Sequence, residues 1–244
     1  MIRRIVAALI LPLFILSGCA TYKTQYTSFR PPEQYLFHVE ADGVKIGAEA
    51  YADKDAADNA FGFDIKGAGG LLPVQLVLDN KSGQSIEIVS SQTFLVDDKG
   101  GYWNLIPTNV AIDRLEKSTE LAAFFGSDTA KGALIGAAAG TILAAAIGIV
   151  AGHDIGSTIG KGAAIGAAGG AIFGGVKGGT SEERPRRITE DIRQKGLEGK
   201  TIPNDYLANG FIFFPGEAES ARELRLQFVE KETGTARTVT IRLK

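Results

Sequence analysis

The residue with the clearest chemistry is Cys19, the only cysteine in the chain. Its thiol can form a thioether, whereas a disulfide within the chain would need a second cysteine. It follows a segment with the pattern of a secretory signal, in which Arg3 and Arg4 give a positive start and residues 5–16 are almost entirely apolar. Because this run is too short to span a bilayer comfortably, we expect cleavage near Cys19 rather than a transmembrane anchor.

The sequence Leu-Ser-Gly-Cys that ends at Cys19 closely resembles the lipobox of bacterial lipoproteins. The resemblance implies that residues 1–18 are a lipoprotein signal peptide and that Cys19 becomes the acylated first residue, with palmitate among the expected acyl groups. Ala20 resembles the pattern that is sorted to the outer membrane, with the inner membrane as the less favoured location. An ordinary signal peptide with a chance cysteine is the alternative.

Charge and composition limit the function of the mature chain. Removal of residues 1–18 leaves 24 Lys and Arg (26 − 2) against 28 Asp and Glu, so the formal net charge moves from −2 to −4. This mild acidity gives no reason to expect nucleic acid as a partner. Residues 19–34 lack a sustained apolar period, and we interpret them as the lipidated cysteine and a plain tether. The alternative is that the aromatic residues of this segment rest at the lipid interface. Fully extended, residues 20–34 reach roughly 50 Å.

Alternating apolar residues predict β-strands on both sides of a glycine-rich segment. The alternation occurs in residues 44–51, 74–79, 86–88, 224–228 and 239–243. Polar turns at residues 80–83 and 98–101 are hairpin signals. In residues 74–79, Val74, Leu76 and Leu78 alternate with Gln75, Val77 and Asp79.

Neither β block is expected to fold as a domain on its own, because its edge strands would lack partners. We therefore predict a mainly β fold with one sandwich in two parts, residues 35–112 and 200–244, interrupted by residues 113–199. Residues 72–80 and 209–215 also resemble strands of immunoglobulin-like domains in bacterial envelope proteins. That resemblance implies an immunoglobulin-like β-sandwich and says little about ligands.

The interruption contains two series of glycines at a spacing of four residues, with Ala144 in one gap. This spacing lines small residues along one helical ridge, which lets helices pack closely in membranes. In water each such glycine would cost a helix about 1 kcal/mol. We assign a helix-packing role to these glycines: Gly132, Gly136, Gly140, Gly148, Gly152, Gly156, Gly160, Gly162, Gly166, Gly170, Gly174 and Gly178.

The spacing predicts a helical hairpin over about residues 131–179. With a break at residues 152–154, the arms 132–151 and 159–178 would each be about 30 Å long, the thickness of a hydrocarbon core. The segment resembles the glycine-zipper hairpins of bacterial envelope lipoproteins and surface antigens, which implies a transmembrane hairpin. A soluble helical hairpin packed on the sandwich and a flexible linker are the alternatives. The charged flanks are expected to be solvated helices or loops.

Few residue constellations suggest an enzyme. His38 and His153 are the only histidines and lie in different modules, and the chain has no H-E-x-x-H or paired-cysteine spacing, so we predict no metal site and no cofactor. The chain also lacks the nucleophile pattern G-x-S-x-G. Residues 156–162 resemble a phosphate loop but lack the Ser or Thr after the lysine. We interpret Asp97 as part of a turn and Trp103 as sandwich core.

Together these features predict a non-enzymatic, lipid-anchored protein of the bacterial cell envelope with a structural or adaptor role. Its expected partners are the membrane, an unidentified envelope protein and other copies of itself through the zipper. The alternative function is an oligomeric membrane pore built from the hairpins.

Overall fold

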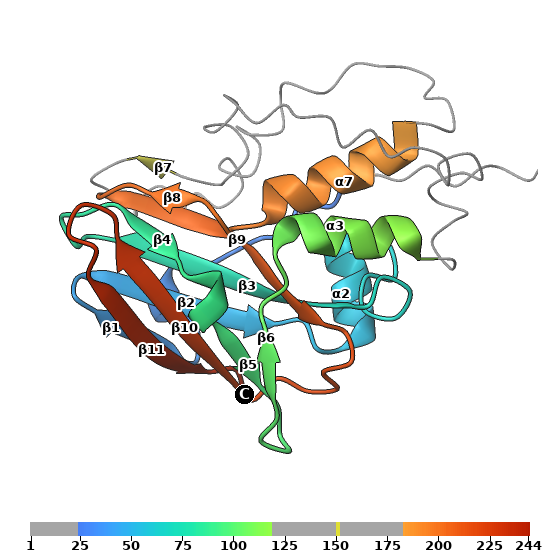
Figure 1. Ribbon diagram of the computed structural model, residues 1–244, viewed down its shortest axis with the longest axis horizontal. Helices are drawn as coiled ribbons and strands as arrows, with labels where there is room; N and C mark the ends of the chain where they lie inside the picture. The colour runs from blue at the N-terminus through green and yellow to red at the C-terminus, as the bar shows by residue number, and fades with distance from the viewer. Residues whose placement is uncertain (1–23, 119–149, 152–182) are drawn as a thin grey trace, which may run out of the picture.

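The computed structural model describes residues 24–118, 150–151 and 183–244. This part of the chain is mainly β, with two facing sheets and a group of helices against one of them (Figure 1). Sheet A contains, in spatial order, β1 (His38–Ala41), β2 (Val44–Ala50), β3 (Leu71–Asn80), β9 (Tyr206–Pro215) and β7 (Val150–Ala151). Sheet B contains β6 (Tyr102–Asn104), β5 (Phe94–Val96), β10 (Glu223–Glu230), β4 (Ile86–Ile88) and β8 (Thr201–Ile202), and β11 (Ala236–Arg242) also pairs with β10.

Both sheets combine strands from the two sides of the interruption. In sheet A, β3 and β9 pair antiparallel over their whole length, from Leu71 opposite Pro215 to Asn80 opposite Tyr206. In sheet B, β10 pairs with β4 and β5. Each block therefore supplies the partners that the strands of the other block need.

The core between the sheets is built by the apolar positions that alternate along the strands. Sheet A contributes Leu72, Leu76 and Phe214, and sheet B contributes Leu224 and Phe228, all with no exposed surface. Side chains on alternate positions of facing strands meet in this way in a β-sandwich. The mainly β prediction is therefore confirmed, and the two sheets are consistent with a β-sandwich.

The outer face of sheet A is also covered, which the sequence did not predict. Gln75 is 1% exposed and Val77 is fully buried, although both alternate with the β3 residues that build the core between the sheets. A second apolar cluster lies on this outer face, where Phe211 and Phe213 of β9 meet three helices. These are α2 (Lys54–Phe61), α3 (Thr108–Lys117) and α7 (Glu183–Lys195).

The two helices that flank the interruption each bury one face. Ile112 and Leu115 of α3 and Ile188 and Ile192 of α7 are at most 5% exposed and belong to the second apolar cluster. Our expectation of solvated flanks is therefore wrong for these faces. Apolar residues at a spacing of three or four residues can shield the outer face of a sheet while the rest of the helix stays charged.

One of the predicted hairpin turns has a different role. Residues 80–83 do turn, but β3 belongs to sheet A and β4 to sheet B, so this turn carries the chain between sheets. The turn at residues 98–101 does join the paired strands β5 and β6, and a turn also joins β10 and β11. A turn motif sets a local reversal, whereas the packing of both faces decides which sheet the next strand joins.

Almost all of the predicted zipper hairpin, about residues 131–179, lies outside the described residues. The exception is β7, whose Val150 and Ala151 pair with Leu207 and Tyr206 of β9. These two residues are therefore extended, and our assignment of them to the first helical arm is wrong. They supply backbone partners to an edge of β9 that β3 does not cover. Within the described ranges, no helix is long and apolar enough to span a bilayer.

Candidate functional site

The predicted lipidation site, Cys19, lies outside the described residues, as do all twelve predicted zipper glycines. The structure instead describes where the chain leaves the domain toward these segments. Those positions are Thr24 on the way to Cys19, Ser118 at the end of α3, and Glu183 at the start of α7. These positions fix where the chain enters and leaves the described domain.

Residues 24–35, which we call the strap, lie along the outer face of sheet A. The Ser28 carbonyl accepts a hydrogen bond from Gln75 Nε2 at 3.4 Å. Phe29 packs against a small cluster of Tyr35, Val77 and Leu207. Tyr35 is 5% exposed, and its burial raises the pKa of its phenol. The strap is therefore an additional layer over β3 and β9.

The strap packs closely against Gly47 of β2. A Cβ atom at Gly47 would lie 2.5 Å from Tyr35 Cδ2 and 3.0 Å from Pro32 Cα, so a glycine is needed for this close approach. Pro32 begins a short 3-10 helix, η2 (Pro32–Gln34), that ends on Tyr35. This packing has the fit of a protein interior rather than that of a solvated linker.

Two ion pairs add to the packing at the surface. Lys45 Nζ lies 2.7 Å from Glu33 Oε1, and this contact lowers the pKa of the Glu33 carboxyl. The Arg30 guanidinium lies 3.6 Å from Glu49 and 5.1 Å from the centre of the Tyr35 ring. Exposed pairs of this kind contribute little individually, so the apolar contacts dominate the docking.

The strap overturns our interpretation of residues 19–34 as a plain tether, because residues 24–34 are bound to the domain. The sequence contains a signal for this docking. Phe29 and Tyr35 are apolar aromatic residues that need burial, and Gly47 interrupts a strand whose neighbours are larger. A glycine inside a predicted strand commonly marks the close approach of another backbone or side chain.

The helices α3 and α7 form an antiparallel pair at the two ends of the interruption. Thr108, at the start of α3, donates its backbone N–H to Glu198, just after α7, at 3.2 Å. Near the other end of the pair, Thr189 Oγ1 lies 3.3 Å from Glu116 Oε1. The end of α3 and the start of α7 therefore lie at the same end of the pair, and the chain leaves and re-enters the domain there (Figure 1).

A buried ion pair within α7 lies beside the end of α2, which the strap also contacts. Lys195 Nζ lies 2.7 Å from Asp191 Oδ2 and 4.8 Å from the centre of the Phe61 ring. Burial lowers the pKa of Lys195, and the neighbouring Asp191 carboxylate opposes part of that shift. The Ala60 carbonyl, at the end of α2, accepts hydrogen bonds at 3.4 Å from both Lys195 Nζ and Thr27 Oγ1. The start of the strap therefore lies beside the C-terminal end of α7.

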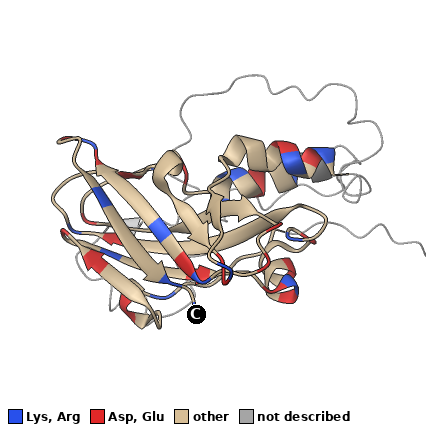
Figure 2. Cartoon of the chain, turned by 60° about the horizontal axis from the view of Figure 1, so that its bottom comes forward, with Lys and Arg blue, Asp and Glu red and all other residues tan. Residues whose placement is uncertain are grey.

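These positions define one side of the domain, which we call the exit side: the start of the strap, the exposed surface of α7, and the end of α3. In Figure 1 the pair of helices and β7 lie at the top, and the C-terminus lies at the bottom. Charges of both signs alternate along α7 (Figure 2), so the exit side has no strong charge of one sign along this helix. Its exposed aromatic residue is Tyr26, which is 70% exposed.

An open depression of about 470 Å³ lies beside the end of α3. Its floor is the glycine-rich residues 67–70, and Arg114, Lys117 and Ser118 form its helical wall. Both cations have partners, because Lys117 pairs with Asp113 at 2.7 Å and Arg114 pairs with Glu217 at 3.4 Å. The depression is therefore not a ready anion site.

The remaining residues that we considered for chemistry have structural contacts. Asp97 accepts hydrogen bonds from Trp103 Nε1 at 2.9 Å and from the Gly101 N–H at 2.7 Å, and these bonds lower the pKa of its carboxyl. Asp97 thus holds the β5–β6 turn, and Trp103 is partly buried against the sandwich core. His38 is exposed on β1, and His153 lies outside the described residues. Among the described residues, no group of three His, Cys, Asp or Glu is placed to bind a metal ion.

No protein-family model, curated protein or solved structure matches this chain. The function must therefore be inferred from the chain's own residues and their arrangement.

Proposed function

We propose that this protein is a non-enzymatic, lipid-anchored protein of the bacterial cell envelope with a structural or adaptor role. Cys19 carries the lipid, and the glycine-rich segments on either side of β7 form a membrane-associated zipper hairpin. The outer membrane is the proposed location, with the domain in the periplasm. The sandwich is proposed to be immunoglobulin-like.

One observation supports this proposal most strongly: the chain leaves the domain for both segments beside the α3–α7 pair, with the strap starting near the C-terminal end of α7 and the interruption at its N-terminal end. Thr27 near the start of the strap contacts Ala60, which also contacts Lys195 of α7. The antiparallel α3 and α7 bring the two ends of the interruption together at one end of the pair. A domain held by an acyl chain and by a hairpin needs this arrangement, because both attachments must reach one bilayer. Two such attachments hold a protein more firmly than a single acyl chain.

The alternative function is an oligomeric pore built from the zipper hairpins. The feature that favours it is the second arm, residues 159–178, which is only weakly apolar and contains Lys161. A polar stripe on such an arm would suit a water-filled lumen. Conductance across liposomes that contain the purified protein separates a pore from an anchored adaptor.

The direct test of the anchor is Cys19→Ala in cells that make the full chain. We expect this variant to remain an uncleaved or soluble precursor, because no other residue can form the thioether. Mass spectrometry of the mature N-terminus measures the outcome. An unmodified N-terminus at any other position in the unsubstituted protein would refute the lipid anchor. Crosslinking in intact envelopes, followed by purification, then identifies the partner that the adaptor role requires.

A further inference from the structure

The strap changes what a lipid on Cys19 would do. We propose that the docked strap orients the domain, so that the exit side, with α7 and Tyr26, rests against the bilayer and the β5–β6 end points away from it. This inference rests on the proposed lipid anchor and goes beyond it, because it names the surface of the domain that meets the lipid.

The lengths of chain decide between a fixed and a free orientation. With the strap docked, only the five residues 19–23 separate the lipid from Thr24. Five extended residues reach roughly 17 Å. The ten residues of β3 are about 34 Å long at the usual rise of a strand. The lipid therefore stays within roughly 17 Å of Thr24, on the side of the domain where the strap begins, while the strap is in place.

Release of the strap would remove this restriction. Residues 19–35 would then act as one tether of seventeen residues, which reaches roughly 55–60 Å when extended. That length exceeds the long dimension of sheet A, so any face of the domain could turn toward the bilayer. The contacts of Phe29, Pro32 and Tyr35 with sheet A thus decide the orientation.

The composition of the exit side agrees with a lipid surface as its partner. Tyr26 is 70% exposed and lies two residues from the first described residue, so it is close to the anchor. Tyrosine prefers the membrane–water interface, because its ring is apolar and its hydroxyl is polar. The mixed charges along α7 avoid strong repulsion from an anionic surface. The ends of the interruption also lie on this side, so a membrane-associated hairpin would pull the domain in the same direction.

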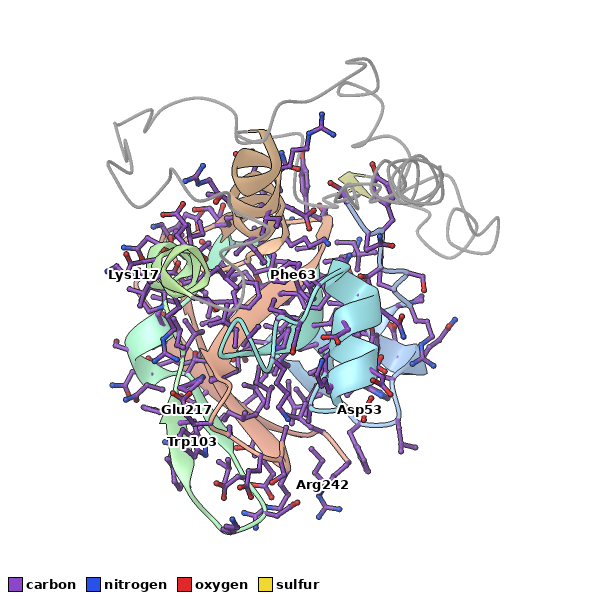
Figure 3. All side chains as sticks on the ribbon, turned by 90° about the vertical axis from the view of Figure 1, so that its right-hand side faces the viewer. Asp53, Phe63, Trp103, Lys117, Glu217 and Arg242 are labelled. Carbon is purple, nitrogen blue, oxygen red and sulfur yellow. The ribbon has the colours of Figure 1, made fainter. Side chains whose placement is uncertain are left out.

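The chain supplies a natural optical probe, because Trp103 is its single tryptophan. Trp103 lies on β6, at the end of the molecule away from α7 (Figure 3). Energy transfer from a tryptophan to a dansyl-labelled lipid falls steeply with distance, so it reports how near each probe is to the bilayer. A second probe on the exit side is obtained with the double variant Trp103→Phe, Arg193→Trp, because the Arg193 side chain is 58% exposed on α7.

The experiment uses the full chain reconstituted in phosphatidylcholine vesicles that contain dansyl lipid. In a parallel preparation the chain without residues 1–18 is coupled through the Cys19 thiol to a maleimide lipid, so that orientation is measured whatever the cell attaches to Cys19. We expect several-fold more transfer from the tryptophan at position 193 than from Trp103 in both preparations. Equal transfer, or more transfer from Trp103, would overturn the proposed orientation.

The role of the strap is tested with Gly47→Ala, which places a methyl group 2.5 Å from Tyr35 Cδ2 without changing the strap itself. Glu40→Ala, at an exposed position on the neighbouring β1, is the matched control. Amide hydrogen exchange at Gln34 and Tyr35, whose N–H groups bond to Pro31 and Pro32, reports release of the strap.

We expect Gly47→Ala to speed amide exchange at Gln34 and Tyr35. It should also make energy transfer from Trp103 and from the tryptophan at position 193 more nearly equal. Glu40→Ala should change neither measurement. If hydrogen exchange shows that the strap is released but energy transfer from the two tryptophan positions stays unequal, the orienting role of the strap is overturned. Failure of the lipid anchor is seen separately, as an unmodified Cys19 in mass spectrometry, and leaves the result with the maleimide lipid intact.

Discussion

Gln75 Nε2 donates a hydrogen bond to Asn209 Oδ1 at 3.0 Å, although the two residues lie on opposite sides of the interruption. Gln75 is 1% exposed on β3, and Asn209 lies on the neighbouring β9. Loss of the hydrogen-bond partner of a buried amide lowers the free energy of unfolding by about 1–3 kcal/mol. The two blocks therefore share a sheet, a core and a buried polar contact, which makes each block dependent on the other.

The first prediction concerns the limits of the interruption. Replacing residues 119–182 by a short Gly/Ser linker should leave a cooperatively folding β-protein, because α3 and α7 remain to cover Phe211 and Phe213. Replacing residues 113–199 should destabilise the protein by several kcal/mol. It removes α7 and Leu115, and full burial of each Leu, Ile or Phe side chain is worth about 1.5–3 kcal/mol. Urea unfolding of the two variants measures the difference.

Separate expression of the two blocks is the control for this prediction. Residues 24–118 and residues 183–244 should each be unfolded alone, since β3 lacks β9 in one and β10 lacks β4 and β5 in the other. Two independent cooperative melts would contradict the shared fold. Equal stability of the two deletion variants would contradict the covering role of the helices.

The second prediction concerns the ion pair of Asp191 with Lys195. Lys195→Met should destabilise the protein by about 3 kcal/mol, because it leaves a buried carboxylate without this cation. Asp191 is 4% exposed, so water cannot readily replace the ammonium group. The double variant Asp191→Asn, Lys195→Met should cost less than the sum of the single variants. A double-mutant cycle by urea unfolding measures the coupling, and additive costs would show that the pair does not interact.

The third prediction is a pH dependence of stability from Lys200. Burial lowers the pKa of Lys200 from 10.5 to about 8, although its Nζ donates to the carbonyls of Arg193 and Gln194. Between these two pH values the folded state loses this proton while the unfolded state keeps it. This group's contribution to the free energy of unfolding should therefore rise from pH 8 to pH 10.5.

The comparison with Lys200→Met isolates this contribution, because the other titrating groups are the same in both proteins. Unfolding in urea at pH 7.5, 9 and 10 should show the unsubstituted protein gaining stability relative to the variant. A constant difference between the two proteins over this range would mean that the pKa of Lys200 is not lowered by folding.

The fourth prediction concerns the zipper glycines. In the Cys19→Ala background, replacing Gly136, Gly140, Gly166 and Gly170 by leucine should preserve membrane insertion and weaken helix association. Leucine is more apolar than glycine but prevents close backbone approach. Carbonate extraction measures insertion, and crosslinking in detergent measures association. Complete release of the Cys19→Ala protein by carbonate would favour a soluble hairpin, and undiminished crosslinking of the leucine variant would exclude a packing role for the glycines.

Local patterns in the sequence were enough to predict most of the strands and most of the turns, but not β8, and not β7, which we assigned to a helical arm. Leu224, Leu226 and Phe228 alternate because one face of β10 is buried, and Asp98 and Gly100 lie in the turn that joins β5 and β6. The helix α2 was missed, although its caps are visible in the sequence. Asp53 accepts the Ala56 N–H at 2.9 Å, and Gly62 ends the helix with a φ of 76°.

The sequence by itself determined that a mainly β domain is interrupted, that its single cysteine follows a signal-like segment, and that its glycines are spaced by four residues. Only the tertiary structure decided that β3 pairs with β9, that β4 leaves the sheet of β3, and that the strap covers Val77. The reason is physical. Alternation and turn propensity act over a few neighbouring residues, whereas the burial of a second face depends on segments that are distant along the chain and find each other only in the folded domain.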